Sequence, residues 1–265
     1  WWLYEASAKE LYHTIGRGHL FEKHPEGWEG ALSQKPRVIA LTRVSKTLAF
    51  SFVDSGPVFS EQTVIFPLDR GADLAVLQSN IHAVFAWQHC SRMKSDLRYG
   101  PSDALEPFPF PFESNFENWE ELDQCGEALH QIRTSVMSQF GIGLTKLYNR
   151  FHDPEEGGEW VAGLRDLYRH IDEKVLNAYG WGDLDLAHAF HSVPYLPERD
   201  RTRFTISEPA RIELLRRLSE LNRQRYEEEV SQGLHGKVFP TRTTRALRAR
   251  SESPPQKGLD LGELM

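Results

Sequence analysis

Apolar residues change their spacing along the chain. Short runs rich in β-branched and aromatic residues come first, separated by turn-forming residues, and their length is typical of strands. These runs are residues 37–44, 47–53, 63–68 and 74–78. The spacing then becomes helical over residues 79–93, where Ile81, Val84, Phe85 and Cys90 fall near one face. The pattern predicts a small β-rich domain that includes one helix.

A proline–aromatic segment, PFPFPF at residues 107–112, follows. Proline fixes φ and lacks a backbone N–H, so this segment predicts an extended strap whose phenylalanines fill a core. Beyond it, apolar residues recur every three or four positions, which predicts three helices. The first opens at a capping box, residues 114–117, and ends at Gly141 and Gly143; the second covers residues 159–179; the third begins at residues 207–209 and fades at 227–229.

The pattern therefore predicts an α+β fold in three parts. A β-rich domain covers residues 1–112, a helical region covers 113–232, and a tail covers 233–265. The tail has few large apolar residues, and between Glu229 and Glu252 its only charges are basic. This composition is typical of a solvated or disordered tail, with a docking or nucleic-acid arm as the alternative.

Composition narrows the class of protein. Of 265 residues, 40% are hydrophobic and 26% are charged, as in ordinary globular proteins. There is no run of 18 apolar residues, so no transmembrane helix is expected. The two cysteines, Cys90 and Cys125, cannot form a disulfide framework, and no secretory signal is present. We therefore expect a cytoplasmic protein.

The charge is unevenly distributed. The net charge of −7 argues against a general nucleic-acid coat, but residues 1–112 account for only −1 of it. No acidic residue lies between Glu29 and Asp54. The basic residues in that interval are Lys35, Arg37, Arg43 and Lys46. This basic strip fits either a nucleic-acid contact or the solvated face of a strand.

Motifs for catalysis are missing. The sequence has no phosphate loop, no nucleophile elbow and no Asn-Pro-Pro-[Tyr/Phe] tetrapeptide. The carboxylates of residues 172–174 fall in a predicted helix, where such charges normally face solvent. Two histidine pairs, 82/89 and 188/191, cannot complete a usual zinc set with two cysteines. We expect no catalytic, cofactor or metal site in this segment.

One short segment has the composition needed to read bases. If residues 92–98 are extended, their charged side chains share one face. These are Arg92, Lys94, Asp96 and Arg98. Donors mixed with one acceptor suit the edges of base pairs better than a row of phosphates. The alternative is a half-buried strand with an ordinary ladder of ion pairs.

The same segment resembles a family signature. Residues 91–99 (SRMKSDLRY), 101–103 (PSD) and 108–111 (FPFP) resemble a signature of MmeI-like (type IIL) restriction–modification enzymes and related single-chain adenine-specific DNA methyltransferases. Further similar pieces, in the family's order, are residues 1–2 with 11–12, 143–149 with 151–154, and 178–181 with 218–225. The sequence departs from the family in having Met93 where leucine is common, and in lacking the methyltransferase motifs.

The resemblance implies a role in DNA recognition. Catalysis would lie upstream, in a methyltransferase domain that uses S-adenosylmethionine and, where a nuclease is fused, Mg²⁺. Trp1 is then expected to mark the seam after that domain. This chain would bind duplex DNA sequence-specifically as the C-terminal segment of an adenine-N6 methyltransferase or methyltransferase–endonuclease fusion. Two alternatives are a stand-alone specificity subunit that docks on a separate methyltransferase and a non-DNA interaction domain.

The resemblance also assigns roles to residues. Lys94 and Asp96 match a pair that reads one base pair at the edge of the site, and Arg98 matches a neighbouring reader. Lysine donating to guanine while aspartate accepts from the paired cytosine would recognise one G·C pair. Weaker candidates, by position ahead of the third strand, are Ser60, Glu61 and Gln62. Contacts to phosphates, which position without specifying, are expected from Arg37, Arg43, Lys46 and Arg92.

Overall fold

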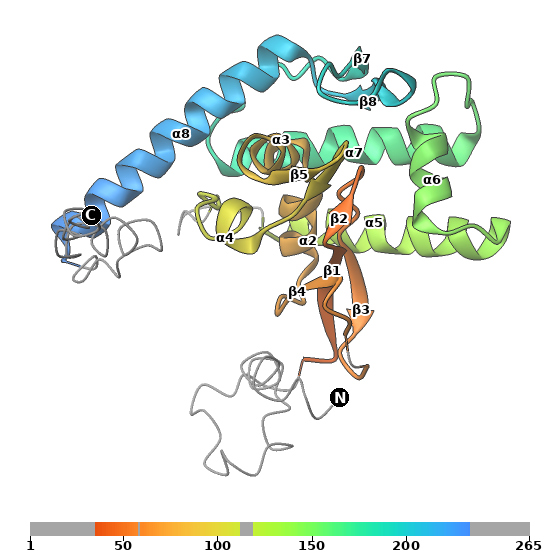
Figure 1. The fold of residues 1–265 in the computed structure, drawn as a ribbon, viewed down its shortest axis with the longest axis horizontal. Helices are drawn as coiled ribbons and strands as arrows, with labels where there is room; N and C mark the ends of the chain where they lie inside the picture. Colours follow the sequence, from red (N-terminus) through yellow and green to blue (C-terminus); the bar gives the residue numbers. More distant parts are fainter. Residues whose placement is uncertain (1–34, 58, 112–118, 234–265) are drawn as a thin grey trace, which may run out of the picture. The chain divides into compact units, whose positions relative to one another are not determined.

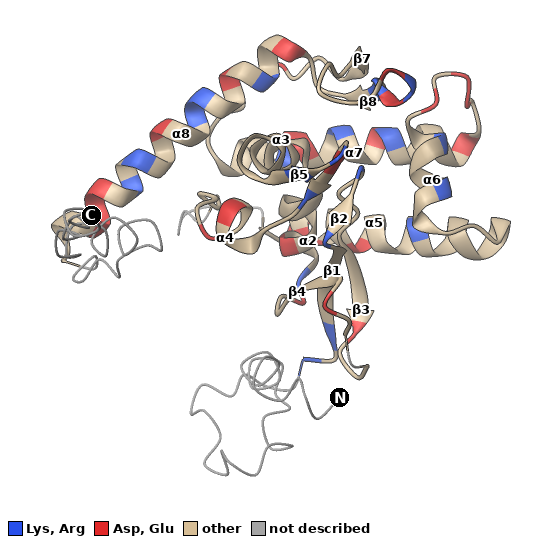
Figure 2. Cartoon of the chain, viewed as in Figure 1, with Lys and Arg blue, Asp and Glu red and all other residues tan. Residues whose placement is uncertain are grey.

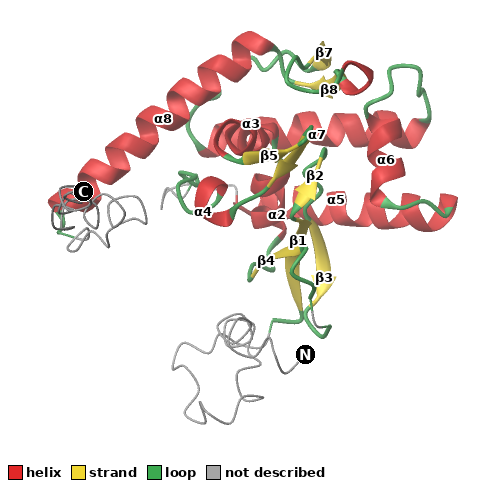
Figure 3. Cartoon of the chain, viewed as in Figure 1, coloured by secondary structure: helices red, strands yellow, loops and turns green. Residues whose placement is uncertain are grey.

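A computed structural model describes residues 35–57, 59–111 and 119–233 (Figure 1). The predicted α+β class is confirmed, because short antiparallel sheets in the N-terminal part are followed by helices (Figure 3). The chain divides into two compact units, Trp1–Asn222 and Arg223–Met265. The capping box at 114–117, the tail, and the family-like residues 1–2 and 11–12 lie outside the described residues.

The first sheet has the strand order β3-β1-β4 and is antiparallel throughout. Its strands are β1 (Arg37–Thr42), β3 (Ser51–Asp54) and β4 (Thr63–Phe66), which confirms three of the predicted strands. Ile39 in the central strand pairs with Phe52 on one side and Phe66 on the other, and all three are buried. This cross-strand row gives the sheet its core face.

The second sheet is smaller, with the order β2-β6-β5. Its strands are β2 (Val44–Ser45), β5 (Ser91–Met93) and β6 (Asp96–Arg98). Helix α3 (Asn80–His89) leads into β5, so it ends before the predicted limit at residue 93. A short helix, α4 (Pro101–Ala104), follows β6.

The prediction of a fourth strand at residues 74–78 is wrong. These residues belong to helix α2 (Gly71–Gln78), in which every residue is buried. Leu74 and Leu77 pack in the core under the sheet, whereas Ala72 and Val76 pack in the larger core of the helical part. A helix that is covered on all sides has no polar face, so its short apolar run has no helical period and resembles a buried strand.

Helices make up most of the remaining described chain, as predicted. Three of them match the predicted helices: α5 (Trp119–Phe140), α7 (Glu159–Ala178) and α8 (Glu208–Ser231). A fourth, α6 (Leu144–Phe151), is not predicted from the sequence. Gly141 follows α5 with φ +60°, the left-handed conformation expected of a helix-ending glycine. A hairpin of β7 (Ala189–Ser192) and β8 (Thr202–Thr205), with the 3₁₀ turn η3 (Glu198–Asp200) between them, precedes α8. Acidic and basic positions alternate along α8 (Figure 2).

Two glycines bring α2 and α5 into direct backbone contact. A Cβ atom at Gly126 would overlap the carbonyl oxygen of Gly71, and a Cβ atom at Gly71 would overlap that of Asp123. The strap adds to the same packing, because Phe108 is buried in the larger core, as predicted, and Phe110 packs against both cores. Residues on both sides of position 112 therefore share one apolar core. Phe112 lies outside the described residues.

The expectation that Asp172 faces solvent is wrong. Asp172 is fully buried, and its carboxylate accepts hydrogen bonds from the backbone and side-chain nitrogens of Asn80, both at 2.7 Å. His188 Nε2 lies 2.6 Å from the same carboxylate. Asn80 is the first residue of α3, where backbone N–H groups lack helical partners and a negative charge is stabilising. Asp172 therefore caps a helix from a distant part of the chain.

Buried His82 predicts a loss of stability in acid. Its Nε2 lies 3.0 Å from the hydroxyl oxygen of Tyr99, its Nδ1 has no hydrogen-bond partner among the described residues, and burial lowers its pKa from 6.5 to about 3. Between these two values the unfolded chain binds a proton that the folded chain does not. The free energy of unfolding is therefore expected to fall as the pH decreases from 6.5 towards 3, by at most about 1.4 kcal/mol per pH unit from this residue.

Urea unfolding at pH 7.0 and pH 5.5 checks this expectation. His82→Gln removes the titrating group, so its pH dependence should be shallower than that of the unaltered chain. The control His170→Gln changes a half-exposed histidine and should leave the slope unchanged. Equal slopes in all three proteins would contradict the assignment to His82.

Candidate nucleic-acid interface

The segment predicted to read bases is a hairpin rather than one strand. β5 and β6 pair antiparallel, with Arg92 opposite Leu97 and Met93 opposite Asp96. Only two residues, Lys94 and Ser95, form the turn. Lys94 has φ +57°, at the turn position that glycine often occupies. The prediction of a continuous strand over residues 92–98 is therefore wrong.

The turn also breaks the predicted row of four charged side chains. Residues directly opposite each other in an antiparallel pair point to the same face. Arg92 therefore shares a face with buried Leu97, while Met93, Asp96 and Arg98 share the other face. Lys94 lies in the turn beside that outer face. Lys94 and Asp96 still lie at the same end of the hairpin, as recognition of one base pair by both would require.

The base of the hairpin is fixed by the core. Leu97 and Tyr99 are buried, and the Tyr99 ring packs edge-on against Phe50 and Phe66, with centroids 5.7 and 5.9 Å apart. On the other side of the hairpin, the Cys90 sulfur accepts a hydrogen bond from the backbone N–H of Gly100 at 3.4 Å. By contrast, Met93 next to the turn is 49% exposed. A rigid base thus presents an exposed tip.

Arg43 links this hairpin to the first sheet. Its backbone N–H donates to the carbonyl of Gln62, and its carbonyl accepts from the N–H of Tyr99, both at 2.8 Å. Gln62 is exposed, with its side-chain nitrogen 3.4 Å from the Glu61 carboxylate. The structure therefore brings Gln62, Arg43 and the end of β6 together from three separate parts of the sequence.

The cations of this region differ in whether they have protein partners. Within the described chain, the side chains of Arg43, Lys94 and Arg98 have no hydrogen-bond or ion-pair partner, and the Arg43 Nε is buried without one. The first lies where the two sheets meet, and the others lie in the hairpin. Their hydrogen-bonding capacity is available to a ligand, which is what a contact to DNA requires.

Arg37, in contrast, is bound within the protein. Its guanidinium pairs with both oxygens of Glu127 on α5, donates to the carbonyl of Asp69, and lies 3.7 Å from the Phe52 ring centroid. The hydrogen bonds to Glu127 raise the pKa of Arg37 and lower that of Glu127. Arg37 stands at the opposite end of β1 from Arg43, about 20 Å away at the rise of an extended strand.

Lys46 and Arg92 also have partners. Lys46 Nζ lies 2.6 Å from the Asp200 carboxylate in η3. The Arg92 guanidinium lies over the rings of Trp87 and Tyr195, at 5.8 and 5.3 Å from their centroids. Acidic residues far away in the sequence thus neutralise much of the predicted basic strip. Phosphate contacts by Arg37, Lys46 and Arg92 remain predictions, and each would have to compete with these partners.

The sequence did not mark Met93 as a surface residue. Alternation along a single strand placed it opposite the charged row, whereas the hairpin places it on the exposed face beside Asp96. A glycine in the turn would have indicated the hairpin, but Lys94 and Ser95 are not strong turn signals. Among the described residues, no group of three or more His, Cys, Asp or Glu is placed to hold a metal ion. No helix in the described ranges is long and apolar enough to cross a membrane.

Comparisons with known proteins show which proteins this chain is similar to. Residues 5–112 match the family model of the target recognition domain of MmeI, which confirms the resemblance expected from the sequence. A solved structure of the type IIL restriction–modification enzyme MmeI in complex with DNA has the same fold, with a TM-score of 0.51 at 15% identity. The match covers 79% of this chain and 25% of that one, so this chain spans about a quarter of its length. No curated protein matches the sequence.

Proposed function

We propose that this chain recognises a specific duplex DNA sequence as the target-recognition part of a restriction–modification enzyme. One observation carries the proposal: the hairpin is held rigidly at Leu97 and Tyr99, while the cations at its exposed end have no partner among the described residues. A structural ladder of ion pairs, which was the alternative for this segment, would have paired them. The match of residues 5–112 to a target recognition domain agrees with this assignment.

The hairpin has the form and chemistry for direct readout. The major groove of B-DNA admits a two-stranded β-ribbon, and lysine or arginine donates to guanine there while aspartate accepts from cytosine. We assign Lys94, Asp96 and Arg98 to base edges, with Gln62 as a further reader. Met93, on the same face, can contact a thymine methyl group. Arg43, between the two sheets, is the best-placed contact to a phosphate.

The same resemblance suggests which domains accompany this chain in a longer protein. We infer an adenine-N6 methyltransferase domain upstream that binds S-adenosylmethionine, and Mg²⁺ if a nuclease domain is fused to it. The cytoplasm, where DNA is accessible and thiols stay reduced, is the compartment that suits this role and the two free cysteines.

The salt dependence of DNA binding tests the proposal. Neutralising phosphates releases counterions, so the logarithm of the association constant should fall linearly with that of the salt concentration, with a slope of about −0.9 per phosphate contacted. Arg43→Gln is expected to reduce this slope by about 1. Lys146→Gln, which removes an exposed cation on α6, is expected to leave it unchanged.

Gel-shift titration of the 265-residue chain on a mixed-sequence duplex, between 50 and 200 mM salt as a workable range, provides the measurement. The absence of binding at the lowest salt concentration, or binding that salt does not weaken, would exclude DNA recognition by this surface. It would favour the alternative of a protein-interaction domain.

A further inference from the structure

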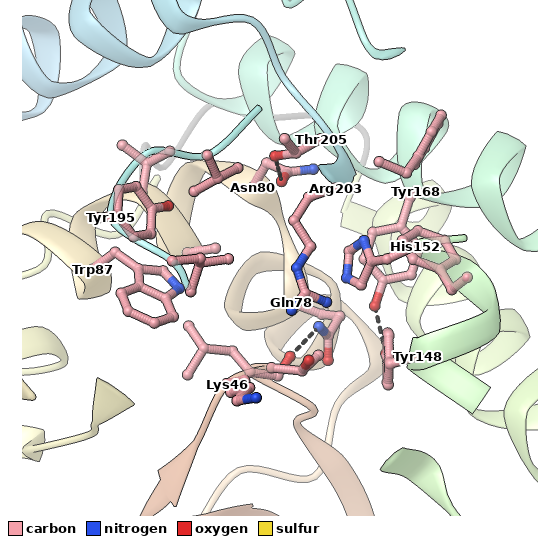
Figure 4. Close-up of a pocket in the computed structure, with 18 residues that line it drawn as sticks. Lys46, Gln78, Asn80, Trp87, Tyr148, His152, Tyr168, Tyr195, Arg203 and Thr205 are labelled. Carbon is pink, nitrogen blue, oxygen red and sulfur yellow. Dashed lines mark hydrogen bonds between the residues drawn. The ribbon is translucent and has the colours of Figure 1, made fainter. Parts of the chain in front are cut away.

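A cavity of about 100 Å³ lies among the loop that follows β2, the helices α2, α3, α6 and α7, and the β7–β8 hairpin (Figure 4). Its lining includes Lys46, His152 and Arg203, and no acidic side chain among the described residues. The space is large enough to hold several water molecules or a small ion.

The two cations that line the cavity share one carboxylate. Lys46 Nζ lies 2.6 Å from the carboxylate of Asp200, and the Arg203 guanidinium lies 3.9 Å from it. Asp200 itself does not line the cavity. Since one carboxylate cannot neutralise two cations, an anion in the cavity would be stabilised by the remaining charge.

Arg203 is the centre of this site. It is only 9% exposed, its Nε donates to the backbone carbonyl of Asp200 at 2.8 Å, and its guanidinium reaches into the middle of the cavity between Gln78 and His152 (Figure 4). Burial lowers the pKa of Arg203 because nearby charges do not fully compensate for its lost hydration. A buried cation that shares its counter-ion with a second cation is costly unless something else pairs with it.

His152 lies beside Arg203 in the lining of the cavity (Figure 4). Burial, followed by the charges of Arg203 and Arg165, lowers the pKa of His152 well below its ordinary value, so the ring is neutral. The cations that would attract an anion here are therefore Arg203 and Lys46.

We propose that this cavity binds one small oxyanion of the phosphate class, held by Arg203 and Lys46. The anion comes either from solution or from the DNA backbone. The anion site does not depend on the proposed reading of bases, because the residues that line the cavity are not the base readers of the hairpin.

Thermal unfolding of the full chain in inorganic phosphate tests the proposal without DNA. Compared with chloride at equal ionic strength and pH, phosphate is expected to raise the Tm in a saturable manner, since a ligand of the folded state stabilises it by mass action. Arg203→Gln is expected to abolish the increase, and Lys46→Gln to weaken the phosphate affinity at least tenfold. Should Arg203→Gln fail to fold, Lys46→Gln carries the test alone.

Arg199→Gln is the matched control. Arg199 is 81% exposed and approaches the same carboxylate, but it does not line the cavity, so the variant should respond to phosphate like the unaltered chain. The proposal is overturned if phosphate gives no stabilisation beyond that of chloride, or if Lys46→Gln keeps the full response.

Given a phosphate response, a gel shift with and without phosphate identifies the source of the anion. If the site takes a DNA phosphate, free phosphate will compete with the duplex, and Lys46→Gln will reduce the salt slope by about 1. If it takes a free anion, duplex affinity will be the same with and without phosphate at equal ionic strength. A failure of the chain to bind DNA would affect the proposed function but not the anion site.

Discussion

Exchanging Lys94 for Glu and Asp96 for Arg is expected to change the DNA sequence that the chain prefers, rather than to abolish binding. Lysine donates to guanine and aspartate accepts from cytosine, so the exchange Lys94→Glu with Asp96→Arg reverses donor and acceptor at one base pair. Each good base contact contributes about 1–3 kcal/mol of discrimination, which corresponds to a change in preference of about 5- to 150-fold at that pair. Phosphate contacts elsewhere would be kept.

Selection from a randomised duplex pool, followed by sequencing, measures the preference of each variant. Lys146→Glu on α6 repeats the change made at position 94, far from the turn in sequence, and should leave the selected sequence unchanged. An unchanged preference in the double variant would show that these two residues do not read bases, even if the chain still binds DNA.

Gly126→Ala is expected to have the largest effect on stability. The added methyl group would overlap the backbone of α2 at Gly71, and neither helix can relieve the overlap by changing a rotamer. Overpacking of a close-packed interior costs about 1–3 kcal/mol and more where the backbone must move, so we expect a loss of about 3 kcal/mol or more in the free energy of unfolding.

Gly163→Ala is expected to have the opposite effect on the free energy of unfolding. Gly163 lies in the exposed part of helix α7, and no atom of the described residues lies within 4 Å of its Cβ position, so alanine there should raise stability by about 0.5–1 kcal/mol. Urea unfolding of both variants gives the comparison. If Gly126→Ala were as stable as the unaltered chain, the close approach of α2 and α5 would be refuted.

How much of the fold the sequence predicts depends on how each element is covered. β4 and α7 each have one buried and one wetter side, so their periods are visible in the sequence and predict both elements. α2 is buried on all sides and its apolar residues show no helical period, so its sequence predicts a strand. The hairpin of β5 and β6 is not predicted because its turn is made by Lys94 and Ser95 rather than by glycine or asparagine.

The candidate site shows a second limit to what the sequence can predict. The segment around residues 92–98 could be found from its composition, but the state of its charges could not. Arg37 pairs with Glu127 and Lys46 with Asp200, which lie 90 and 154 positions away in the sequence. A basic strip that is free of acids locally can therefore be neutralised in the folded chain. Which cations remain available is a property of the tertiary structure.

In the hairpin, the residues that pack into the core are different from the residues that are exposed. Leu97 and Tyr99 point into the core, whereas Met93, Lys94 and Arg98 are exposed, and Lys94 and Arg98 bond to no other described residue. Changes at the exposed positions therefore carry little risk of unfolding. A library that varies these positions and Asp96 while keeping the two inward residues should remain folded in most of its members. New DNA specificities could then be selected on an unchanged scaffold.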